Sequence, residues 1–173
     1  MDDIYSIRKA EIKDASGIAK VHTETWQSHY RGQIPDEFLD GLSVEKRAEG
    51  WEKNLSDPKT KTAVFVAESD NEIVGFCCVG PSREGEVADV VGELYAIYVE
   101  SSKQGQGIGS ALVQAGLEYL KNEGFKKATL WVLKTNTLSI CFYESKGWKA
   151  DGKEKREEKD GFVFEEIQYV VDL

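Results

Sequence analysis

Hydrophobic residues recur at two different spacings along the chain, and the spacing separates helical from extended segments. Residues 4–9 alternate weakly between apolar and polar side chains, which predicts a first strand. Asp14 is then the expected N-cap of a helix, whose apolar face repeats at Ala15, Ile18, Ala19, His22 and Trp26. Residues 31–35 interrupt this pattern, and a second helical region carries apolar residues between positions 38 and 55.

From Thr62 the spacing changes to two, as in half-buried strands. Residues 63–67 and 73–79 predict an antiparallel pair joined by a hairpin turn at Asp70 and Asn71. A polar loop covers residues 81–89. The remaining pattern predicts a strand at 94–99, a helix at 107–122 that Gly124 ends, a strand at 128–133, a helix at 137–146 and a hairpin of 148–154 with 162–171, turned at Asp160 and Gly161.

The predicted order β-α-α-β-β-β-α-β-α-β-β indicates an α/β protein with a mixed sheet and helices on both faces. No internal repeat or low-complexity linker interrupts the chain, and its 173 residues fit the usual size of one domain. We therefore expect a single domain over residues 1–173.

Composition and charge narrow the range of partners. Hydrophobic residues make up 40% of the chain and charged residues 31%, as in ordinary globular proteins. The formal net charge of -9 repels phosphate backbones, so we expect no nucleic acid partner. The same charge would favour the approach of cationic amines, although acidity also simply keeps a cytosolic protein in solution.

The three cysteines, Cys77, Cys78 and Cys141, favour a reducing compartment. Their number is odd and two are adjacent, so they provide neither a disulfide framework nor the spacing of metal ligands. Buried, reduced thiols are expected. Residues 1–4 lack the basic and apolar regions of a signal peptide, and no apolar run is long enough to span a membrane. We expect a cytoplasmic protein with no membrane and no metal.

The segment Gln104-Gly105-Gln106-Gly107-Ile108-Gly109-Ser110 carries the strongest chemical signal. It follows a predicted strand and opens a predicted helix. Glycines allow the backbone to turn sharply and to approach a ligand, while a helix N-terminus offers free N–H groups and a positive dipole end. The segment therefore suits a phosphate or pyrophosphate, although a tight turn without a ligand would have the same composition.

Two common nucleotide motifs do not match this spacing. A P-loop requires Gly-Lys-Ser/Thr after four intervening residues, and no lysine stands there. A dinucleotide fingerprint, Gly-x-Gly-x-x-Gly, would need a third glycine where Leu112 stands.

The pattern that does match is Gln/Arg-x-x-Gly-x-Gly/Ala, at Gln104, Gly107 and Gly109. With it the chain resembles the GNAT superfamily of N-acetyltransferases over nearly its whole length. Residues 97–99 with 105–112 resemble the family's acetyl-CoA motif. Asn136 with Phe142-Tyr143-Glu144-Ser145-Lys146-Gly147-Trp148 resembles its second motif, with Trp148 in place of the usual Phe.

This resemblance implies a mostly antiparallel sheet that is splayed between strands 94–99 and 128–133, with acetyl-CoA as co-substrate in the gap. Ile97 and Val99 would bind the pantetheine arm through their backbones. Asn136 would contact the coenzyme, cap the following helix, or do both. The pyrophosphate would be held by the amides of Gln104, Gly105, Gln106, Gly107, Ile108, Gly109 and Ser110.

Amine acetylation requires an ammonium to lose a proton, the amine to attack a thioester, and the leaving thiolate to gain a proton. The resemblance assigns the acid to Tyr143, which would otherwise be a half-buried aromatic residue. It assigns the base to Glu93, acting through water, where the alternative is a solvated charge at a strand entrance. His22 and His29 are rival bases, with His22 better explained as a core histidine.

In the family, the region of Trp26, Tyr30 and residues 31–35 builds one wall of the acceptor pocket, where aromatic rings can hold a cationic amine. Trp26 is also in phase with Ile18 and Ala19, which favours the core. The expected acceptor is a primary amine of a small molecule, such as a polyamine.

Two other functions remain open, a non-catalytic acetyl-CoA sensor and a protein or peptide acetyltransferase. An acidic groove near Tyr30 and Glu86 would favour the latter. Dimers of relatives suggest a homodimer interface at residues 162–171.

Overall fold

The computed structural model describes residues 4–85, 87–159 and 161–173. The order of its strands and α-helices is the predicted one, except that the second helical region, expected between positions 38 and 55, forms two separate helices. In sequence the elements are β1 (Ser6–Lys9), the 3-10 turn η1 (Ile12–Asp14), α1 (Ala15–His29), α2 (Asp36–Asp40), α3 (Val44–Ser56), β2 (Ala63–Ser69), β3 (Glu72–Pro81), β4 (Val91–Val99), the 3-10 turn η2 (Ser101–Lys103), α4 (Ile108–Asn122), β5 (Lys127–Leu133), α5 (Thr137–Ser145), β6 (Lys149–Lys159) and β7 (Phe162–Asp172).

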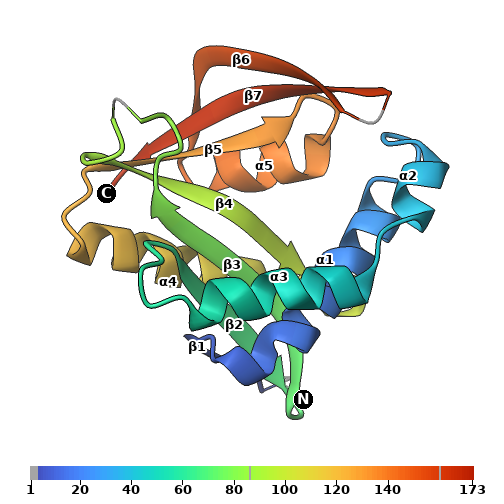
Figure 1. Ribbon diagram of the computed structural model, residues 1–173. Coiled ribbons are helices and arrows are strands. Elements are labelled where there is room, and N and C mark those ends of the chain that lie inside the picture. The colour runs from blue at the N-terminus through green and yellow to red at the C-terminus, as the bar shows by residue number, and fades with distance from the viewer. Residues whose placement is uncertain (1–3, 86, 160) are drawn as a thin grey trace.

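The strands form one mixed sheet in the order β1-β2-β3-β4-β5-β7-β6 (Figure 1). All neighbouring pairs are antiparallel except β4 and β5, which run parallel. The β2–β3 hairpin turns at Asp70 and Asn71, both with positive φ, as the primed turns of short hairpins require. The predicted fold class, a mostly antiparallel α/β sheet, is confirmed.

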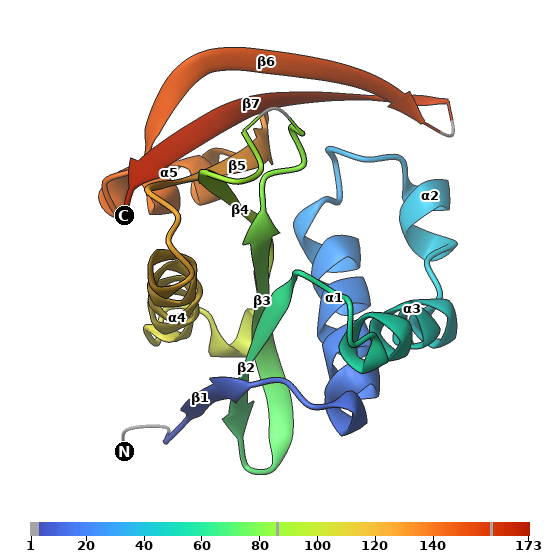
Figure 2. The ribbon, with the colours of Figure 1, turned by 60° about the vertical axis from the view of Figure 1, so that its left-hand side comes forward.

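Helices cover both faces of this sheet, because side chains of successive strand residues point in opposite directions. Val64 and Val66 of β2 pack in a cluster with Ile18 of α1 and partly buried residues of α3. Their neighbours Ala63 and Ala67 pack in a second cluster with α4 and α5. Figure 2 shows the first strands almost edge-on, with α4 on one side and α1 and α3 on the other.

Strands β4 and β5 separate after a short contact, which is the feature that shapes the centre of the molecule. They pair only from Val91 to Glu93, opposite Lys127 to Thr129. Immediately afterwards the register of β4 against β3 shifts, so that Tyr95 has no residue opposite it. Such a bulge bends a strand and increases its twist. The later part of β4 therefore turns away from β5 and leaves an opening between them.

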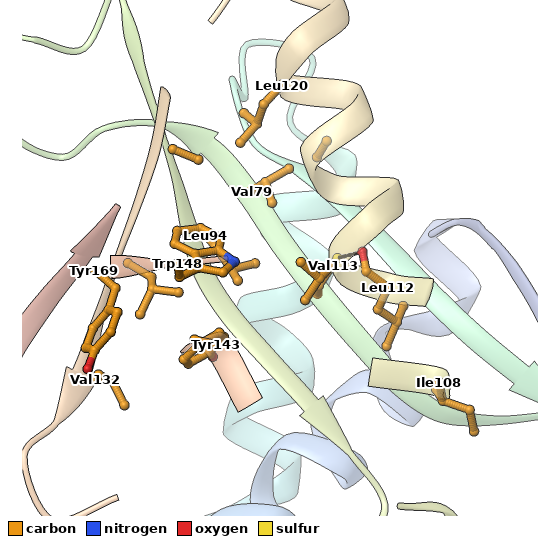
Figure 3. Close-up of a cluster of buried hydrophobic side chains, with 14 of the residues drawn as sticks. Val79, Leu94, Ile108, Leu112, Val113, Leu120, Val132, Tyr143, Trp148 and Tyr169 are labelled. Atoms are coloured by element: carbon orange, nitrogen blue, oxygen red, sulfur yellow. Dashed lines mark hydrogen bonds between the residues drawn. The ribbon is translucent and has the colours of Figure 1, made fainter. Parts of the chain in front are cut away.

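The core between the sheet and α4 and α5 is drawn in Figure 3, where Tyr143, Trp148 and Leu94 lie close together beside the separating strands. Trp148 is 1% exposed, and its ring centre lies 6.0 Å from that of Tyr143. The buried indole therefore packs against Tyr143 of α5.

Asp14 is the N-cap residue of α1, as expected, but its side chain makes no capping bond to this helix. Its carboxylate instead accepts from the Glu11 backbone N–H and from Arg8, each at 2.7 Å, and closes the preceding 3-10 turn. The expectation that all three thiols are buried is wrong. Cys141 is exposed, whereas Cys77 and Cys78 are buried and burial raises the pKa of both thiols to about 12.

The closing hairpin is longer than predicted, since β6 extends to Lys159. Its predicted turn includes Asp160, which lies outside the described residues. β7 lies between β5 and β6, so both of its backbone edges are paired within the chain. The homodimer interface at 162–171 stays a prediction, limited to the side chains of β7. No described helix has the length and apolarity needed to cross a membrane.

Replacing Trp148 by Ala should lower the free energy of unfolding by about 3–5 kcal/mol, because a fully buried indole leaves a cavity that the sheet cannot fill. Denaturant unfolding followed by far-UV circular dichroism measures this. Leu138→Ala is the control, since Leu138 is 74% exposed and its loss should cost less than about 0.5 kcal/mol. Equal effects of the two changes would contradict the account of the core.

Candidate active site

A cavity of about 730 Å³ opens where β4 and β5 separate. Its walls come from α1, β4, the glycine-rich turn before α4, β5, α5 and the β6–β7 hairpin. Such a volume suits a small-molecule or cofactor site. It brings together elements that lie far apart in the sequence.

The glycine-rich turn lies at one end of this cavity. Gly105 and Gly107 have φ of 78° and 82°, the left-handed region that side chains other than glycine adopt only with strain. Gly107 is the N-cap of α4 and offers no side-chain oxygen to the helix. The N–H groups of Ile108, Gly109 and Ser110 precede the first intrahelical bond, so helix geometry leaves them free to bind a ligand.

Five of the seven turn residues that were predicted to bind the coenzyme line the cavity. Gln104, Gly105, Gly107, Gly109 and Ser110 line it. Gln106 is exposed, and Ile108 is buried in the core. A contribution of these last two residues to a ligand would come from their backbones.

Ile97 and Val99 line the cavity on β4, beyond the last described pair of β4 with β5. This edge of the strand faces the opening instead of a neighbouring strand. The carbonyl of Val99 accepts a hydrogen bond from Gln104 Nε2 at 3.1 Å, which ties the end of β4 to the glycine-rich turn.

Helix α5 contributes Asn136 and Tyr143, which are seven residues apart and therefore lie on the same face, two turns from each other. Asn136 Oδ1 accepts from the Ser139 backbone N–H at 3.2 Å, so the predicted N-cap is confirmed. Tyr143 is 8% exposed, and burial raises the pKa of its phenol. The hydroxyl thus keeps its proton at neutral pH, as an acid must.

Glu93 lies beneath the cavity wall and is 1% exposed, so the alternative of a solvated charge is wrong. Its carboxylate accepts from the Arg83 backbone N–H at 3.0 Å and from Arg83 Nη2 at 2.8 Å. Arg83 itself lines the cavity, with its guanidinium 5.2 Å from the centre of the Tyr95 ring. The assignment of Glu93 as the base stays a prediction. Its carboxylate would have to accept the proton while it is paired with Arg83.

An aromatic wall closes the other end of the cavity. Trp26 of α1 and Tyr30, the residue that follows this helix, lie 4.9 Å apart between ring centres. The ring centre of Phe38 of α2 lies 6.3 Å from that of Phe164 of β7. Tyr30 is buried, and burial followed by the neighbouring Tyr98 raises the pKa of its phenol. Trp26 both joins this hydrophobic cluster and lines the cavity, so its two expected roles are compatible.

Sequence reasoning missed the contribution of the hairpin and of Arg83. Phe164, Glu166 and Lys155 line the cavity, with Lys155 Nζ 3.6 Å from Glu166 Oε1. Alternation along β7 could have predicted that Phe164 and Glu166 lie on the same face of the strand. It could not have predicted that Phe164 contacts Phe38 of α2. Glu86, named for an acidic groove, lies outside the described residues.

His22 lies among aromatic rings and is absent from the cavity lining. It stacks on Tyr98 at 5.4 Å and accepts at Nδ1 from Trp51 Nε1 at 3.4 Å. Burial, and then the charge of Arg47, lowers the pKa of His22 to about 3. A ring that stays neutral in the core agrees with its expected structural role.

The His22 ring should therefore show no titration between pH 5 and 8 in NMR spectra of the folded protein. Because the unfolded chain binds this proton near pH 6.5 and the folded protein only near pH 3, the free energy of unfolding should fall as the pH drops below 6.5. A midpoint between pH 5 and 8 for His22 would contradict its burial.

Comparison with known proteins identifies relatives of this arrangement. The model of the Acetyltransferase (GNAT) family matches residues 20–148. An uncharacterized N-acetyltransferase of Bacillus subtilis (strain 168) is 36% identical over 143 residues, which cover 82% of this chain and 79% of that protein.

Solved structures share the fold. The PaiA N-acetyltransferase of Thermoplasma acidophilum, in complex with coenzyme A, superposes with a TM-score of 0.75 at 21% identity, covering 98% of this chain and 99% of that one. The yncA protein of Salmonella typhimurium, solved with its cofactor acetyl-CoA, gives a TM-score of 0.73 at 18% identity, covering 98% and 94%. At these identities the likeness concerns the fold.

Proposed function

The chain belongs to the Acetyltransferase (GNAT) family, and from this premise we propose that it transfers an acetyl group from acetyl-CoA to a primary amine of a small molecule. The observation that carries the proposal is the row of free N–H groups at the start of α4, which opens onto the cavity between the separated strands. Two structures of the same fold hold coenzyme A or acetyl-CoA.

The residues at the turn fit the diphosphate of such a coenzyme. A Cβ placed on Gly105 would meet no atom within 4 Å, and one on Gly107 would meet only the Tyr5 hydroxyl, at 3.6 Å. The backbone is therefore uncovered on that side, and an anion can approach its N–H groups and the positive end of the α4 dipole. We assign the pyrophosphate to the amides of residues 104–110.

The remaining coenzyme contacts follow along the opening. Ile97 and Val99 would hold the pantetheine arm through the free edge of β4, as an added strand would be held. Asn136 would donate from its amide nitrogen, since its oxygen already caps α5. When bound, acetyl-CoA supplies an acetyl group activated as a thioester.

Tyr143 is the proposed acid, which donates its proton to the sulfur of the leaving thiol. Tyr143 lies two turns from Asn136 on the same side of α5, and both residues line the opening. For Glu93 we propose a supporting role, in which it holds Arg83 against the cavity wall through the ion pair described above.

The far end of the cavity suits a small amine. The aromatic rings of Trp26, Tyr30 and Phe38 line it, and rings of this kind can hold a cationic amine. The contact between Phe38 and Phe164 bounds this end, which favours a compact acceptor over a polypeptide that continues through the site.

A panel of amines tests the proposal directly. Purified protein would be incubated with acetyl-CoA and polyamines, aminoglycosides, amino acids or short peptides, and released thiol would be measured. We expect amine-dependent release with at least one small amine. Tight coenzyme binding without turnover on any amine would favour a sensor, and turnover on peptides alone would favour a protein acetyltransferase.

Gly107→Val should raise the Kd for coenzyme A at least about tenfold, because a side chain at φ 82° is strained by about 1–2 kcal/mol and stands over the donors. Isothermal titration calorimetry measures the change. Gly50→Val is the matched control, since Gly50 lies on exposed α3 with open space around it. Unchanged affinity of the Gly107 variant would remove the proposed pyrophosphate site.

Tyr143→Phe should lower kcat about 10²-fold while the Kd for coenzyme A stays nearly constant, because only the proton donor is lost. Steady-state kinetics and calorimetry separate the two quantities. Tyr119→Phe, on the half-buried side of α4, provides the control for loss of a phenol hydroxyl. A wild-type kcat for the Tyr143 variant would exclude the tyrosine as the acid.

A further inference from the structure

One hydrogen bond joins the two helices that flank the opening. His29, the last residue of α1, places its Nε2 3.2 Å from Oδ1 of Asn136, the N-cap of α5. Asn136 is 4% exposed, and the same Oδ1 accepts from the Ser139 backbone N–H at 3.2 Å. Because a backbone N–H can only donate, the oxygen of the amide is the atom that faces His29.

This arrangement determines where the imidazole carries its proton. An oxygen acceptor requires His29 to donate through Nε2–H, whether the ring is neutral or charged. In the neutral ring the lone pair is then on Nδ1. An imidazole oriented by a third group in this way is the usual arrangement of a base in proton transfer. Asn136 would thus be the positioning residue for His29.

His29 lines the same cavity as the predicted acid, Tyr143. Its ring centre lies 5.4 Å from that of Tyr30, and both residues line the cavity with Tyr143. Gln33 Nε2 donates to the His29 carbonyl at 3.2 Å, and Thr135 Oγ1 donates to Gln33 Oε1 at 2.8 Å. A second bridge between the α1–α2 loop and the β5–α5 loop therefore fixes the end of α1.

The position of Tyr143 makes the pairing with His29 chemically useful. Asn136, to which His29 is bonded, and Tyr143 share the cavity face of α5. Besides Tyr30 and Tyr143, the titratable groups that line this cavity with His29 are Arg83, Tyr95, Tyr98, Lys103, Lys155, Glu157, Lys159 and Glu166. Burial raises the pKa of the phenols of Tyr30, Tyr98 and Tyr143, so these stay neutral.

We propose, on the premise of the function above, that His29 is the general base of the acetyl transfer. Nδ1 takes a proton from the acceptor ammonium, so that one N–H bond breaks and another forms on the ring. The free amine forms the C–N bond as the C–S bond breaks, and Tyr143 gives its proton to sulfur. After the attack, the nitrogen of the acceptor loses a second proton to water, and the imidazolium of His29 also gives its proton to water. The deprotonated Tyr143 takes one proton back from water.

This step releases one proton per turnover and needs no further reactant. With His29 as the base, the site can work while Glu93 is paired with Arg83. The ion pair then supports the wall of the cavity, and the proton acceptor is on α1 instead of β4.

The pH dependence of kcat/KM separates the two candidate bases. With His29 as base, kcat/KM of the wild type rises with pH and levels off once the ring is neutral. In His29→Gln only amine already deprotonated in solution reacts, so kcat/KM falls about 10²-fold near neutral pH and keeps rising toward the pKa of the acceptor. Glu93→Gln should keep the wild-type shape.

The reverse result, a wild-type profile in His29→Gln and a lost plateau in Glu93→Gln, would overturn the proposal. The Kd for coenzyme A of the His29 variant should change less than tenfold, the weight of one hydrogen bond. If His29→Gln fails to fold, His29→Ala with added imidazole replaces it, and recovery of rate by imidazole is then expected.

The tautomer gives a readout that does not depend on activity. The chain has two histidines, so long-range ¹H–¹⁵N NMR spectra of labelled protein distinguish them with the His29 variant as reference. We expect the neutral His29 ring to carry its proton on Nε2, and a proton on Nδ1 would refute the proposal. Failure of every amine to react would instead reject the proposed function, whatever the tautomer.

Discussion

The short pairing of β4 with β5 is the constraint on which the rest of the structure depends. Three residue pairs hold the two strands together, and the bulge at Tyr95 then turns β4 away. An open sheet edge inside a folded domain exposes backbone groups that need partners. The molecule places this unpaired edge along a cavity, where a bound ligand can take the place of the missing strand. The helices that follow β4 and β5 begin at the same opening, so their N-termini meet there.

The two helix starts use opposite solutions to the same problem of unpaired N–H groups. At α5 the side chain of Asn136 caps the helix and leaves its oxygen also available to His29. At α4 the N-cap is Gly107, which has no side chain and leaves the first N–H groups uncovered. A side chain therefore covers the start of α5, whereas the first N–H groups of α4 are open to a ligand. Ile108 of α4, Tyr143 of α5 and Trp148 belong to the same hydrophobic core.

Three of the charged residues that line the cavity, Arg83, Lys155 and Glu166, are in ion pairs. Glu93 is buried under Arg83, and Lys155 lies beside Glu166 and over the Trp131 ring. Pairing of this kind lowers the cost of placing charge near a partly buried site, but it also restrains each group from exchanging protons. The imidazole of His29 is bound through a neutral amide instead, which orients the ring and leaves one nitrogen available. This difference is the physical reason to look for proton transfer on α1 rather than on β4.

The sequence by itself determined the order of elements, apart from the division between α2 and α3, and it determined the class of sheet, the family resemblance and the residues of the glycine-rich turn. Periodicity, turn residues and motif spacing are local properties of the chain. It could not determine that Glu93 would be covered by Arg83 ten residues away, or that Phe164 would meet Phe38 across the cavity. It also left His29 as one rival among several, since the partner that orients the ring is 107 residues distant. Contacts of this kind depend on where the bulge bends β4 and how the hairpin curves over α2, and only the tertiary structure decided them.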